Sequence, residues 1–389
     1  MHNQEEQADK MRILFFCTFY HRAMLFRQQM DALLSRGHDV VAFNTARYGE
    51  GIAEKFRPLM DEKVVHVECW NKLDRMLFFP RQWKIERQLM KHFDVRRFDL
   101  IHAHLLLSTG YSARRIKQKY NIPYVVTVRV TDLTGFIRIP YFRAMANRIL
   151  SDACGILFLS ASHKEELLRQ YIAPDQRFAI EEKSCIIGNC LEPFWTQHRV
   201  TEGRSRRKSP DEIRVLSVAK IRPVKNLTVA AQAVQLLRDQ GINATLTIVG
   251  ENQDPAELAK IQAFSCVHYI PFMTKDELIQ VYADHDLFLL PSINETFGRV
   301  YIEAMSQGLP VLYTRGQGFD GNFPDGEVGY AVPHNDPSQI ADRILKCMEQ
   351  YAKLSASGVE KSRQFDEDVI MDRLEQFYMD SMHRCEVNS

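Results

Sequence analysis

The chain has 389 residues, of which 45% are hydrophobic and 25% are charged, and this composition excludes a disordered, collagen-like or disulfide-scaffold protein. A chain of this length exceeds one ordinary hydrophobic core, so we predict two domains. The net charge of +1 conceals an asymmetry: residues 11–195 hold 28 Lys and Arg against 19 Asp and Glu, whereas residues 211–389 hold 16 against 26. A basic first half and an acidic second half suggest different partners.

The eight cysteines are scattered, and none forms a CxxC pair or a zinc-finger spacing. Because no secretory leader is recognisable either, we expect reduced thiols and a cytoplasmic protein. The polar, acidic residues 1–10 predict a disordered extension before a first domain that begins at Met11. No apolar run reaches the roughly 20 residues that a membrane span needs, so any membrane contact is expected to be peripheral.

The first domain, residues 11–195, is predicted from alternating strands and helices. Residues 11–16 form a short apolar run, residues 22–36 have the helical period and stop at Gly37, and residues 38–43 are apolar again. The same alternation continues with expected strands at 98–106, 122–130 and 154–160 and expected helices at 111–120 and 162–171.

The polar stretch 196–212 has no periodicity and predicts a linker. After it the opening pattern returns, with a strand at 213–219, a helix at 226–240 and a strand at 244–250. We therefore expect an α/β protein with two Rossmann-like domains facing across a cleft, the second at residues 213–364. Ligands of such parallel sheets bind at the carboxyl ends of the strands.

Two glutamates, Glu295 and Glu303, lie eight positions apart where a strand, 287–292, leads into a helix that begins near Gly298. The N–H groups of Thr296 to Val300 would be free to bind an anion, and Gly298 would let phosphate oxygens approach the backbone. Glu303 could then accept hydrogen bonds from a ribose and Glu295 from a sugar. The alternative is that the helix dipole favours one acid and that solvent surrounds the other.

Two carboxylates would repel a diphosphate, so cations must accompany them. The segment "AKIRPVKN" supplies these cations at the end of the 213–219 strand. Lys220 and Lys225 could clamp the diphosphate and stabilise its charge as it leaves, with Arg222 and Arg299 as weaker candidates. We therefore expect neither a metal nor a cofactor.

The segment "LFLLPSINETFGRVYIEAMSQGLPV" resembles the E-x7-E signature of retaining glycosyltransferases of the GT-B fold, in particular glycosyltransferase family 4. "SVAKIRPVKNL" is similar to that family's diphosphate-binding loop, although the family usually has arginine where this chain has Lys220. Lysine keeps the charge but loses the bidentate fork. Residues 365–383 resemble the family's last helix, which returns to the first domain, so we expect 365–389 to pack there.

The resemblance implies that Glu295 contacts the donor sugar, that Glu303 contacts the ribose, and that the base lies along residues 267–278. The expected donor-binding residues are Glu303, Thr296, Phe297, Gly298, Arg299, Lys220 and Lys225, and the expected catalytic residues are Glu295, Lys225, Lys220 and His104.

The first domain departs further from the family pattern. "CTFYHRAM" has no glycine where the family often has a Gly-Gly loop, and "TVRVTD" places Arg129 where histidine is common while it keeps Asp132. Arg129 would suit a phosphate-bearing acceptor. His102 and His104 point to one side of a strand, and His104 resembles an acceptor-site histidine; a satisfied structural histidine and a metal pair are the alternatives, but no third zinc ligand lies nearby in sequence. The expected acceptor residues are His104, Arg129 and Asp132.

Two further patterns leave alternatives. Asp284 and Asp286 have the spacing of a metal-binding DxD, but they precede a strand, so we expect a helix-to-strand turn. Residues 111–148 carry eight basic residues and one acid among interleaved aromatics. This run is either a surface for anionic membrane lipid and a lipid-diphosphate acceptor or a solvated basic helix. No nucleic-acid motif accompanies it.

Together these patterns predict a retaining glycosyltransferase. It would move sugar from a UDP- or GDP-sugar to a lipid-linked or polysaccharide acceptor in bacterial cell-envelope synthesis. The alternatives are a nucleotide-sugar epimerase of the same fold and a noncatalytic scaffold that binds sugar nucleotides.

Overall fold

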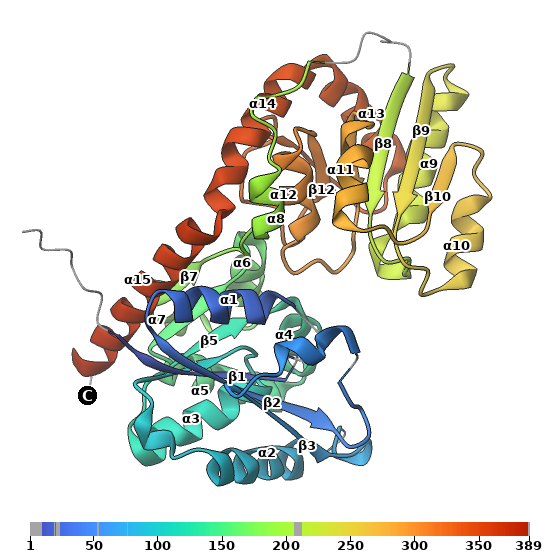
Figure 1. Cartoon of the computed structure of the whole chain (residues 1–389). Helices are drawn as coiled ribbons and strands as arrows, with labels where there is room; N and C mark the ends of the chain where they lie inside the picture. Colours follow the sequence, from blue (N-terminus) through green and yellow to red (C-terminus); the bar gives the residue numbers. More distant parts are fainter. Residues whose placement is uncertain are drawn as a thin grey trace, which may run out of the picture. The chain divides into compact units, whose positions relative to one another are not determined.

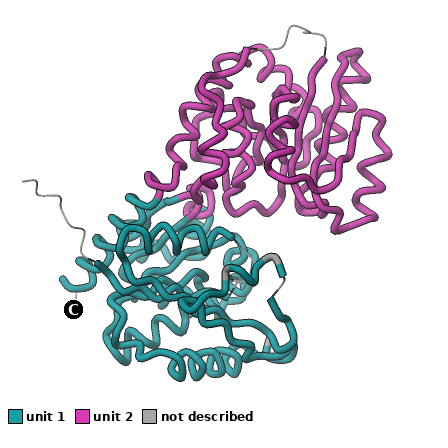
Figure 2. Tube along the Cα trace, in the orientation of Figure 1, with its two compact units in different colours: residues 1–158, 166–187, 371–389 teal, residues 159–165, 188–370 magenta. Residues whose placement is uncertain are grey.

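The computed structural model describes residues 10–18, 20, 24–52, 54–75, 77–205 and 212–387 (Figure 1). The contacts divide the chain into two units (Figure 2): Met1–Phe158, Glu166–Ile187 and Met371–Ser389 form unit 1, and Leu159–Glu165 and Gly188–Ile370 form unit 2. The predicted extension, apart from Lys10, and residues 206–211 of the predicted linker lie outside the described residues. Residues 188–195, which we expected in the first domain, cluster with unit 2 because Leu191 N donates to Phe365 O and Trp195 packs on Tyr282.

Unit 1 contains a seven-stranded sheet with the order β3-β2-β1-β4-β5-β6-β7, in which every pair is parallel. The central strands β1, β4 and β5 are buried along almost their whole length, as expected of strands that are covered on both faces. The strands are β1 (Arg12–Cys17), β2 (Asp39–Arg47), β3 (Val64–Trp70), β4 (Leu100–Ala103), β5 (Tyr124–Val128), β6 (Gly155–Phe158) and β7 (Ser184–Ile186).

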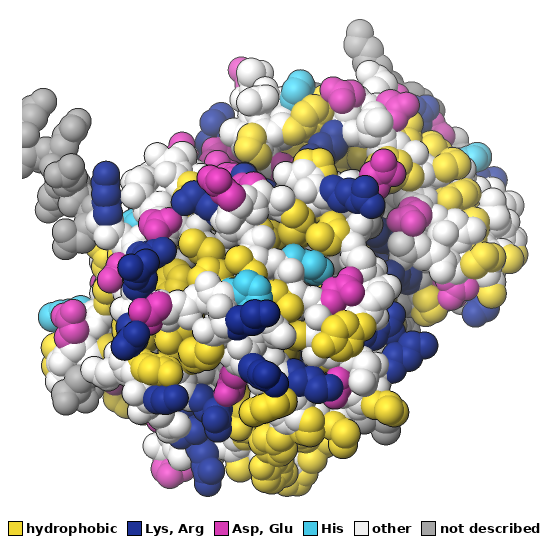
Figure 3. Space-filling view, turned by 60° about the horizontal axis from the view of Figure 1, so that its bottom comes forward, with side chains coloured by type: hydrophobic (Ala, Val, Ile, Leu, Met, Phe, Trp, Pro, Cys, Tyr) yellow, Lys and Arg dark blue, Asp and Glu magenta, His cyan; other side chains and the backbone are white. Residues whose placement is uncertain are grey.

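Helices follow the strands of unit 1 in alternation. The first helix ends at Ser35, and Gly37 then takes a φ of +93°, a left-handed conformation that glycine adopts without strain. The helices are α1 (Met24–Ser35), α2 (Phe78–His92), α3 (Ser108–Tyr120), α4 (Val130–Thr134), α5 (Pro140–Asp152), α6 (Ala161–Gln170) and α7 (Pro174–Glu182), with 3₁₀ turns η2 (Glu54–Leu59), η3 (Leu73–Arg75), η4 (Val95–Arg97) and η5 (Phe136–Arg138). The first turn of α6, up to Glu165, clusters with unit 2. Figure 3 brings the lower part of Figure 1 forward and shows hydrophobic side chains gathered there among Lys and Arg.

The last helix, α15 (Glu367–Val387), begins in unit 2, and its residues from Met371 onward cluster with unit 1. Its Glu375 carboxylate pairs with Arg36 and lies 2.8 Å from His38 Nε2, and its Tyr378 hydroxyl lies 2.7 Å from His102 Nδ1. Near its end Cys385 forms a disulfide with Cys154, 231 residues earlier. The prediction of reduced cysteines is therefore wrong for this pair, because only the return of α15 brings the two residues together.

Unit 2 contains a second parallel sheet, with six strands in the order β10-β9-β8-β11-β12-β13. The strands are β8 (Glu212–Val218), β9 (Asn243–Val249), β10 (Val267–Ile270), β11 (Leu287–Leu290), β12 (Val311–Thr314) and β13 (Gly329–Val332). The helices are α8 (Pro193–Gln197), α9 (Leu227–Asp239), α10 (Pro255–Gln262), α11 (Lys275–Ala283), α12 (Arg299–Ser306), α13 (Pro337–Glu349) and α14 (Tyr351–Ser362), with 3₁₀ turns η6 (Pro223–Lys225) and η7 (Arg363–Phe365). The two sheets with interleaved helices confirm the predicted pair of Rossmann-like domains.

Among the residues that the structure describes, no helix combines the length and the apolar character that a membrane crossing requires.

Candidate functional site

The predicted donor residues lie where the strand order of unit 2 reverses, between β8 and β11. Lys220 and Lys225 follow β8, and Glu295 follows β11. In open α/β sheets this switch point forms the crevice in which ligands bind. The sequence therefore places the lysine loop and the first glutamate at one crevice, although 70 residues separate Lys225 from Glu295.

Lys225 and Glu295 form a direct ion pair, with Nζ 2.6 Å from Oε2 and both side chains largely buried. The preceding loop is held in place by Asn226, which adopts a left-handed φ of 57° and donates through Nδ2 to Pro291 O and His334 O. Lys220 is more exposed, and its Nζ lies 3.5 Å from Glu251. Lys225 therefore pairs with Glu295, whereas Lys220 pairs with Glu251.

The loop that carries Glu295 is fixed on both sides. Glu295 N donates to Gln317 Oε1 (3.2 Å), and Gly318 N donates to Glu295 O (3.0 Å). Ser162 Oγ in turn donates to Gln317 O (2.9 Å). Thr296 therefore lies in a backbone segment with defined hydrogen bonds, and Phe297 after it is buried.

Gly298 begins α12 with a φ of +83°, and a Cβ at this position would lie 2.4 Å from the Tyr301 ring. Tyr301 cannot move away easily, because it is buried and its hydroxyl donates to Leu290 O. The glycine therefore lets the loop after β11 turn directly into the helix, whose first N–H groups have no partner within the helix itself.

Glu303 lies one turn inside α12. Burial raises the pKa of its carboxyl, while Arg299 and Lys275 lower it. The same two cations pair with Glu192, which lies 2.6 Å from Arg299 Nη2. Arg299, which we expected near the diphosphate, is thus paired with the Glu192 carboxylate. Lys275 belongs to residues 267–278, the segment expected to contact the base.

We expect Glu303→Gln to weaken binding of UDP or GDP by about 10- to 100-fold, since a hydrogen bond to a charged group contributes about 1.5–3 kcal/mol. Isothermal titration calorimetry measures this directly. Glu349→Gln, at an exposed position of α13 in the same unit, is the matched control. Equal affinities of the Glu303 variant and the control would remove Glu303 from the nucleotide site.

The histidines of unit 1 have different surroundings. His102 is fully buried, with Nε2 2.7 Å from Thr127 Oγ1 and Nδ1 bonded to Tyr378, and burial lowers its pKa to about 3. The His104 ring stacks on the His102 ring, with 3.9 Å between the ring centres. Burial lowers the pKa of His104 well below the ordinary value. His102 is thus a satisfied structural residue. His104 is also buried, and its Nε2 has no hydrogen-bond partner among the described residues.

The other predicted acceptor residues, Arg129 and Asp132, hold the loop after β5. Asp132 accepts hydrogen bonds from Leu106 N (3.2 Å) and Arg129 N (3.0 Å), and Arg129 Nε donates to His104 O (3.2 Å). The Arg129 guanidinium also lies 5.0 Å from the centre of the Phe26 ring. The structure therefore brings His104, Arg129 and Asp132 together through the backbone.

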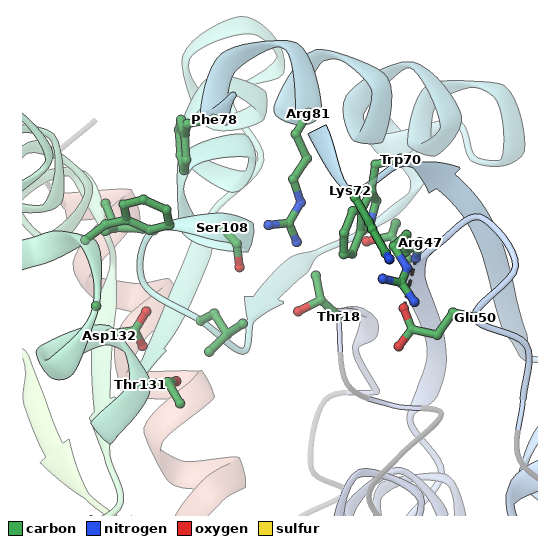
Figure 4. A pocket seen from close by; sticks show the side chains of 15 residues that line it. Thr18, Arg47, Glu50, Trp70, Lys72, Phe78, Arg81, Ser108, Thr131 and Asp132 are labelled. Atoms are coloured by element: carbon green, nitrogen blue, oxygen red, sulfur yellow. Dashed lines mark hydrogen bonds between the residues drawn. The ribbon is translucent and has the colours of Figure 1, made fainter. Parts of the chain in front are cut away.

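A cavity of about 720 Å³ opens at the carboxyl ends of β1 to β5, and Asp132 lines it. Figure 4 shows the side chain of Arg81 pointing into this space from α2, with Thr18 and Ser108 also facing it. Arg47 is the last residue of β2, and Lys72 follows β3. The Arg81 guanidinium lies over the Trp70 ring, 4.3 Å from its centre. This cavity has three cationic and two acidic side chains, and its lining residues are Thr18, Thr45, Arg47, Glu50, Trp70, Lys72, Phe78, Arg81, Leu105, Leu107, Ser108, Thr131, Asp132, Gly135 and Phe136.

Asp132 makes the stability of the folded protein depend on pH. Burial raises its pKa to about 6, although hydrogen bonds from the backbone act in the opposite direction. The folded state therefore favours the protonated carboxyl, so this contribution to stability is present near pH 4 and is lost as the pH rises through 6. We expect the free energy of unfolding of the wild type, relative to Asp132→Asn, to fall by about 2–3 kcal/mol between pH 4 and pH 7. Urea titrations of both proteins measure the difference, and a constant difference across this range would contradict the assignment.

The basic run 111–148 is largely engaged within unit 1. Arg114 pairs with Asp152 and Arg115 with Glu86, while Arg138 and Arg143 donate to backbone carbonyls. The run is therefore not one free cationic surface, and only some of its members remain exposed.

The DxD spacing lies in a turn, as predicted. Asp284 caps the end of α11, and Asp286 precedes β11 and accepts from Arg214 N. Among the described residues no group of three or more His, Cys, Asp or Glu side chains could hold a metal ion.

Several residues of these sites were not predicted from sequence. Gln317 and Gly318 brace the donor loop from a segment after β12, and Glu192 reaches Arg299 from before α8. Arg47 and Lys72 line the cavity from the end of β2 and from just after β3. The ends of apolar strands, read systematically, would have indicated these last two residues.

Comparison with known proteins agrees with this geometry. The family model "Glycosyl transferases group 1" matches residues 200–365, and "Glycosyltransferase Family 4" matches residues 25–180. A D-inositol 3-phosphate glycosyltransferase from Pseudarthrobacter chlorophenolicus is 27% identical over 262 residues, which cover 63% of this chain and 61% of that protein. This match thus spans about three fifths of the relative's length.

Two solved structures share the fold over nearly the whole chain. The sucrose-phosphate synthase from Thermosynechococcus elongatus has a TM-score of 0.71 at 18% identity, covering 95% of this chain and 98% of its own. HepE from Anabaena, in complex with UDP, has a TM-score of 0.68 at 16% identity, covering 95% and 100%. With both family models matched, two parallel sheets of this kind and the E-x7-E segment in place, the chain belongs to the family 4 glycosyltransferases of the GT-B fold.

Proposed function

We propose that the protein is a retaining glycosyltransferase that moves a sugar from a nucleoside diphosphate sugar to an acceptor with a negatively charged group. The ion pair between Lys225 and Glu295 at the switch point of the second sheet carries this proposal. It places a cation and a hydrogen-bond acceptor within one ligand's reach, beside the N-terminus of α12.

In this reaction the bond between the sugar C1 and the diphosphate oxygen breaks, the acceptor hydroxyl oxygen bonds to C1, and the hydroxyl proton passes to the departing diphosphate. Lys225, Lys220 and the first N–H groups of α12 would stabilise the charge on the departing diphosphate. Glu295 would hold the sugar hydroxyls, and Glu303 those of the ribose. Because protein cations supply the positive charge, we expect transfer to continue in EDTA.

UDP-sugars and GDP-sugars are the donors to test first. The solved structure of HepE contains UDP. The base would lie along residues 267–278, where Lys275 already approaches Glu303.

The acceptor would bind in the cavity of unit 1. Arg47, Lys72 and Arg81 give it an excess of positive charge, which suits a phosphate or carboxylate. The aromatic wall made by Trp70, Phe78 and Phe136 suits an apolar portion of the same molecule. A lipid-linked phosphate of the bacterial cell envelope has both an anionic group and an apolar portion. The relative from Pseudarthrobacter chlorophenolicus is named for D-inositol 3-phosphate, which also has an anionic group.

The test is a thermal-shift screen of UDP, GDP, ADP and their common sugars with and without EDTA, because a ligand of the native state raises the apparent stability. We expect one nucleotide family to stabilise the protein in the presence of EDTA. The matching donor is then incubated with and without inositol phosphate and lipid phosphate acceptors. Conversion of the donor alone to an epimer would instead identify an epimerase, and donor binding without any product would identify a noncatalytic scaffold.

A further inference from the structure

Helix α2 carries an exposed apolar stripe beside its buried face. Phe78, Gln82, Ile85 and Leu89 pack inward, as the helical period requires. Phe79, Trp83 and Met90 form a second stripe, roughly 110° around the helix from the buried one. These three side chains are exposed, Trp83 by 60%. An ordinary surface helix would carry polar residues on this stripe.

This apolar stripe continues onto neighbouring segments. Leu73 and Leu77, just before α2, are exposed by 71% and 54%. The ring centres of Phe79 and Tyr141 are 6.0 Å apart, which joins α2 to the start of α5, where Phe136 and Ile139 are also exposed. We call the set Leu73, Leu77, Phe79, Trp83, Phe136, Ile139 and Tyr141 the aromatic platform. Contiguous exposed apolar area of this kind marks an interaction site.

Cations border the aromatic platform. A groove of about 240 Å³ between α2 and α3 is lined by Trp83 and Met90 together with Arg87, Arg115 and Lys119. The Arg87 guanidinium lies 5.6 Å from the centre of the Trp83 ring, so the apolar and cationic parts are in direct contact. Lys91, Arg138 and Arg148 are exposed on the same helices and turn.

The acids of these segments are already neutralised. Asp74 is buried and accepts from Lys84 (2.7 Å), and Glu86 pairs with Arg115 (3.0 Å). Two further acids lie in the α4–α5 region: Asp132 is buried, and Asp152 pairs with Arg114 (2.6 Å). The exposed charge that remains around the platform is therefore positive, and it is carried by Arg87, Lys91, Lys119, Arg138 and Arg148.

We propose that the aromatic platform and its cationic border dock unit 1 onto an anionic lipid bilayer, with α2 lying in the plane of the membrane interface. Aromatic rings and aliphatic side chains enter the boundary between head groups and acyl chains, while Arg and Lys contact lipid phosphates. The charge favours this partner over a second copy of the chain, because two copies of one cationic surface repel each other. The platform also meets the wall of the unit 1 cavity, since the Phe78 and Phe136 ring centres are 6.4 Å apart.

The experiment measures binding of the full chain to vesicles by flotation, without nucleotide or acceptor. Vesicles of phosphatidylcholine alone are compared with vesicles containing an equal amount of phosphatidylglycerol. Binding to the anionic vesicles only, weakened by salt, is the expected result. The fluorescence of Trp83 provides a local signal, because Trp195 is buried and Trp70 lies beneath Arg81. Its emission should shift to shorter wavelength on binding, and Trp83→Phe should lose that shift while it still binds.

Three variants make the test specific. Phe79→Ser with Trp83→Ser should weaken vesicle binding by about tenfold or more, and Arg87→Glu with Lys119→Glu should abolish the preference for anionic lipid. Phe178→Ser, at a position exposed by 72% on α7 of the same unit, is the matched control and should bind like the wild type. Circular dichroism confirms that each variant is folded.

Other outcomes would overturn the proposal. These are equal binding to both vesicle types, no binding by a folded protein, a Trp83 signal that does not respond to vesicles, or concentration-dependent dimerisation that the platform variants abolish. Because no donor or acceptor is present, failure here is independent of the transfer assay.

Discussion

Replacing Lys225 by alanine should lower sugar transfer by about 10²- to 10³-fold while the protein stays folded, since removal of one preorganised donor to a developing negative charge has an effect of this size. Lys225 is the cation that the structure joins directly to Glu295, at 2.6 Å and largely out of solvent. Its removal affects both the leaving diphosphate and the orientation of Glu295. The measurement is kcat with saturating donor, together with calorimetric affinity for the nucleotide.

The controls separate chemistry from stability. Lys260→Ala removes an exposed lysine from α10 of the same unit and should leave activity unchanged. Lys220→Ala should have a smaller effect than Lys225→Ala, because Lys220 is about half exposed and pairs only loosely with Glu251. The Glu295 carboxylate left without Lys225 should cost about 1–3 kcal/mol of unfolding free energy, which Glu295→Gln in the same chain should partly restore. Full activity in a folded Lys225→Ala protein would contradict the proposal that Lys225 binds the diphosphate.

Replacing Gly318 by alanine should weaken donor binding at least tenfold, although the position carries no functional side chain. A Cβ there would lie 2.3 Å from Thr296 C and 2.5 Å from Phe297 N, and these backbone atoms cannot rotate away. The donor loop must therefore move, and it loses the hydrogen bond from Gly318 N to Glu295 O. A shift of about 1 Å in a group that positions the substrate can lower the rate of catalysis by about 10²-fold.

Gly316→Ala is the matched control in the same segment. Gly316 has a left-handed φ of +73°, but its Cβ would meet open space. The expected cost is conformational, about 1–2 kcal/mol of stability without loss of donor affinity. If Gly316→Ala and Gly318→Ala bind the nucleotide equally well, the support that Gly318 gives to the loop has no role in binding.

The donor site is the part of the protein that sequence reasoning described most fully. Glu295, Gly298 and Glu303 belong to one strand–loop–helix segment, so their relative placement follows from local geometry. Lys225 could be added because the carboxyl ends of parallel strands share one edge of the sheet. The ion pair between Lys225 and Glu295 shows that these two strand ends do lie together.

The interpretation of the histidines shows where such reasoning ends. Alternation along the strand correctly placed His102 and His104 on one side. It could not show that Tyr378, 276 residues later, would satisfy His102, since that contact exists only because α15 returns to unit 1. The same return joins Cys154 to Cys385.

Hydrophobic periodicity and short loops act over a few neighbouring positions, so they were enough to predict the fold class, the two parallel sheets and the position of the proposed donor residues. Which cations pair with acids and which line the cavity depends on contacts between distant segments. In the basic run 111–148, Arg114 and Arg115 pair with Asp152 and Glu86, whereas Arg47, Lys72 and Arg81, from three separate segments, line one cavity. Long-range pairing leaves no local pattern, so net charge along the chain cannot tell a paired cation from one that faces a ligand.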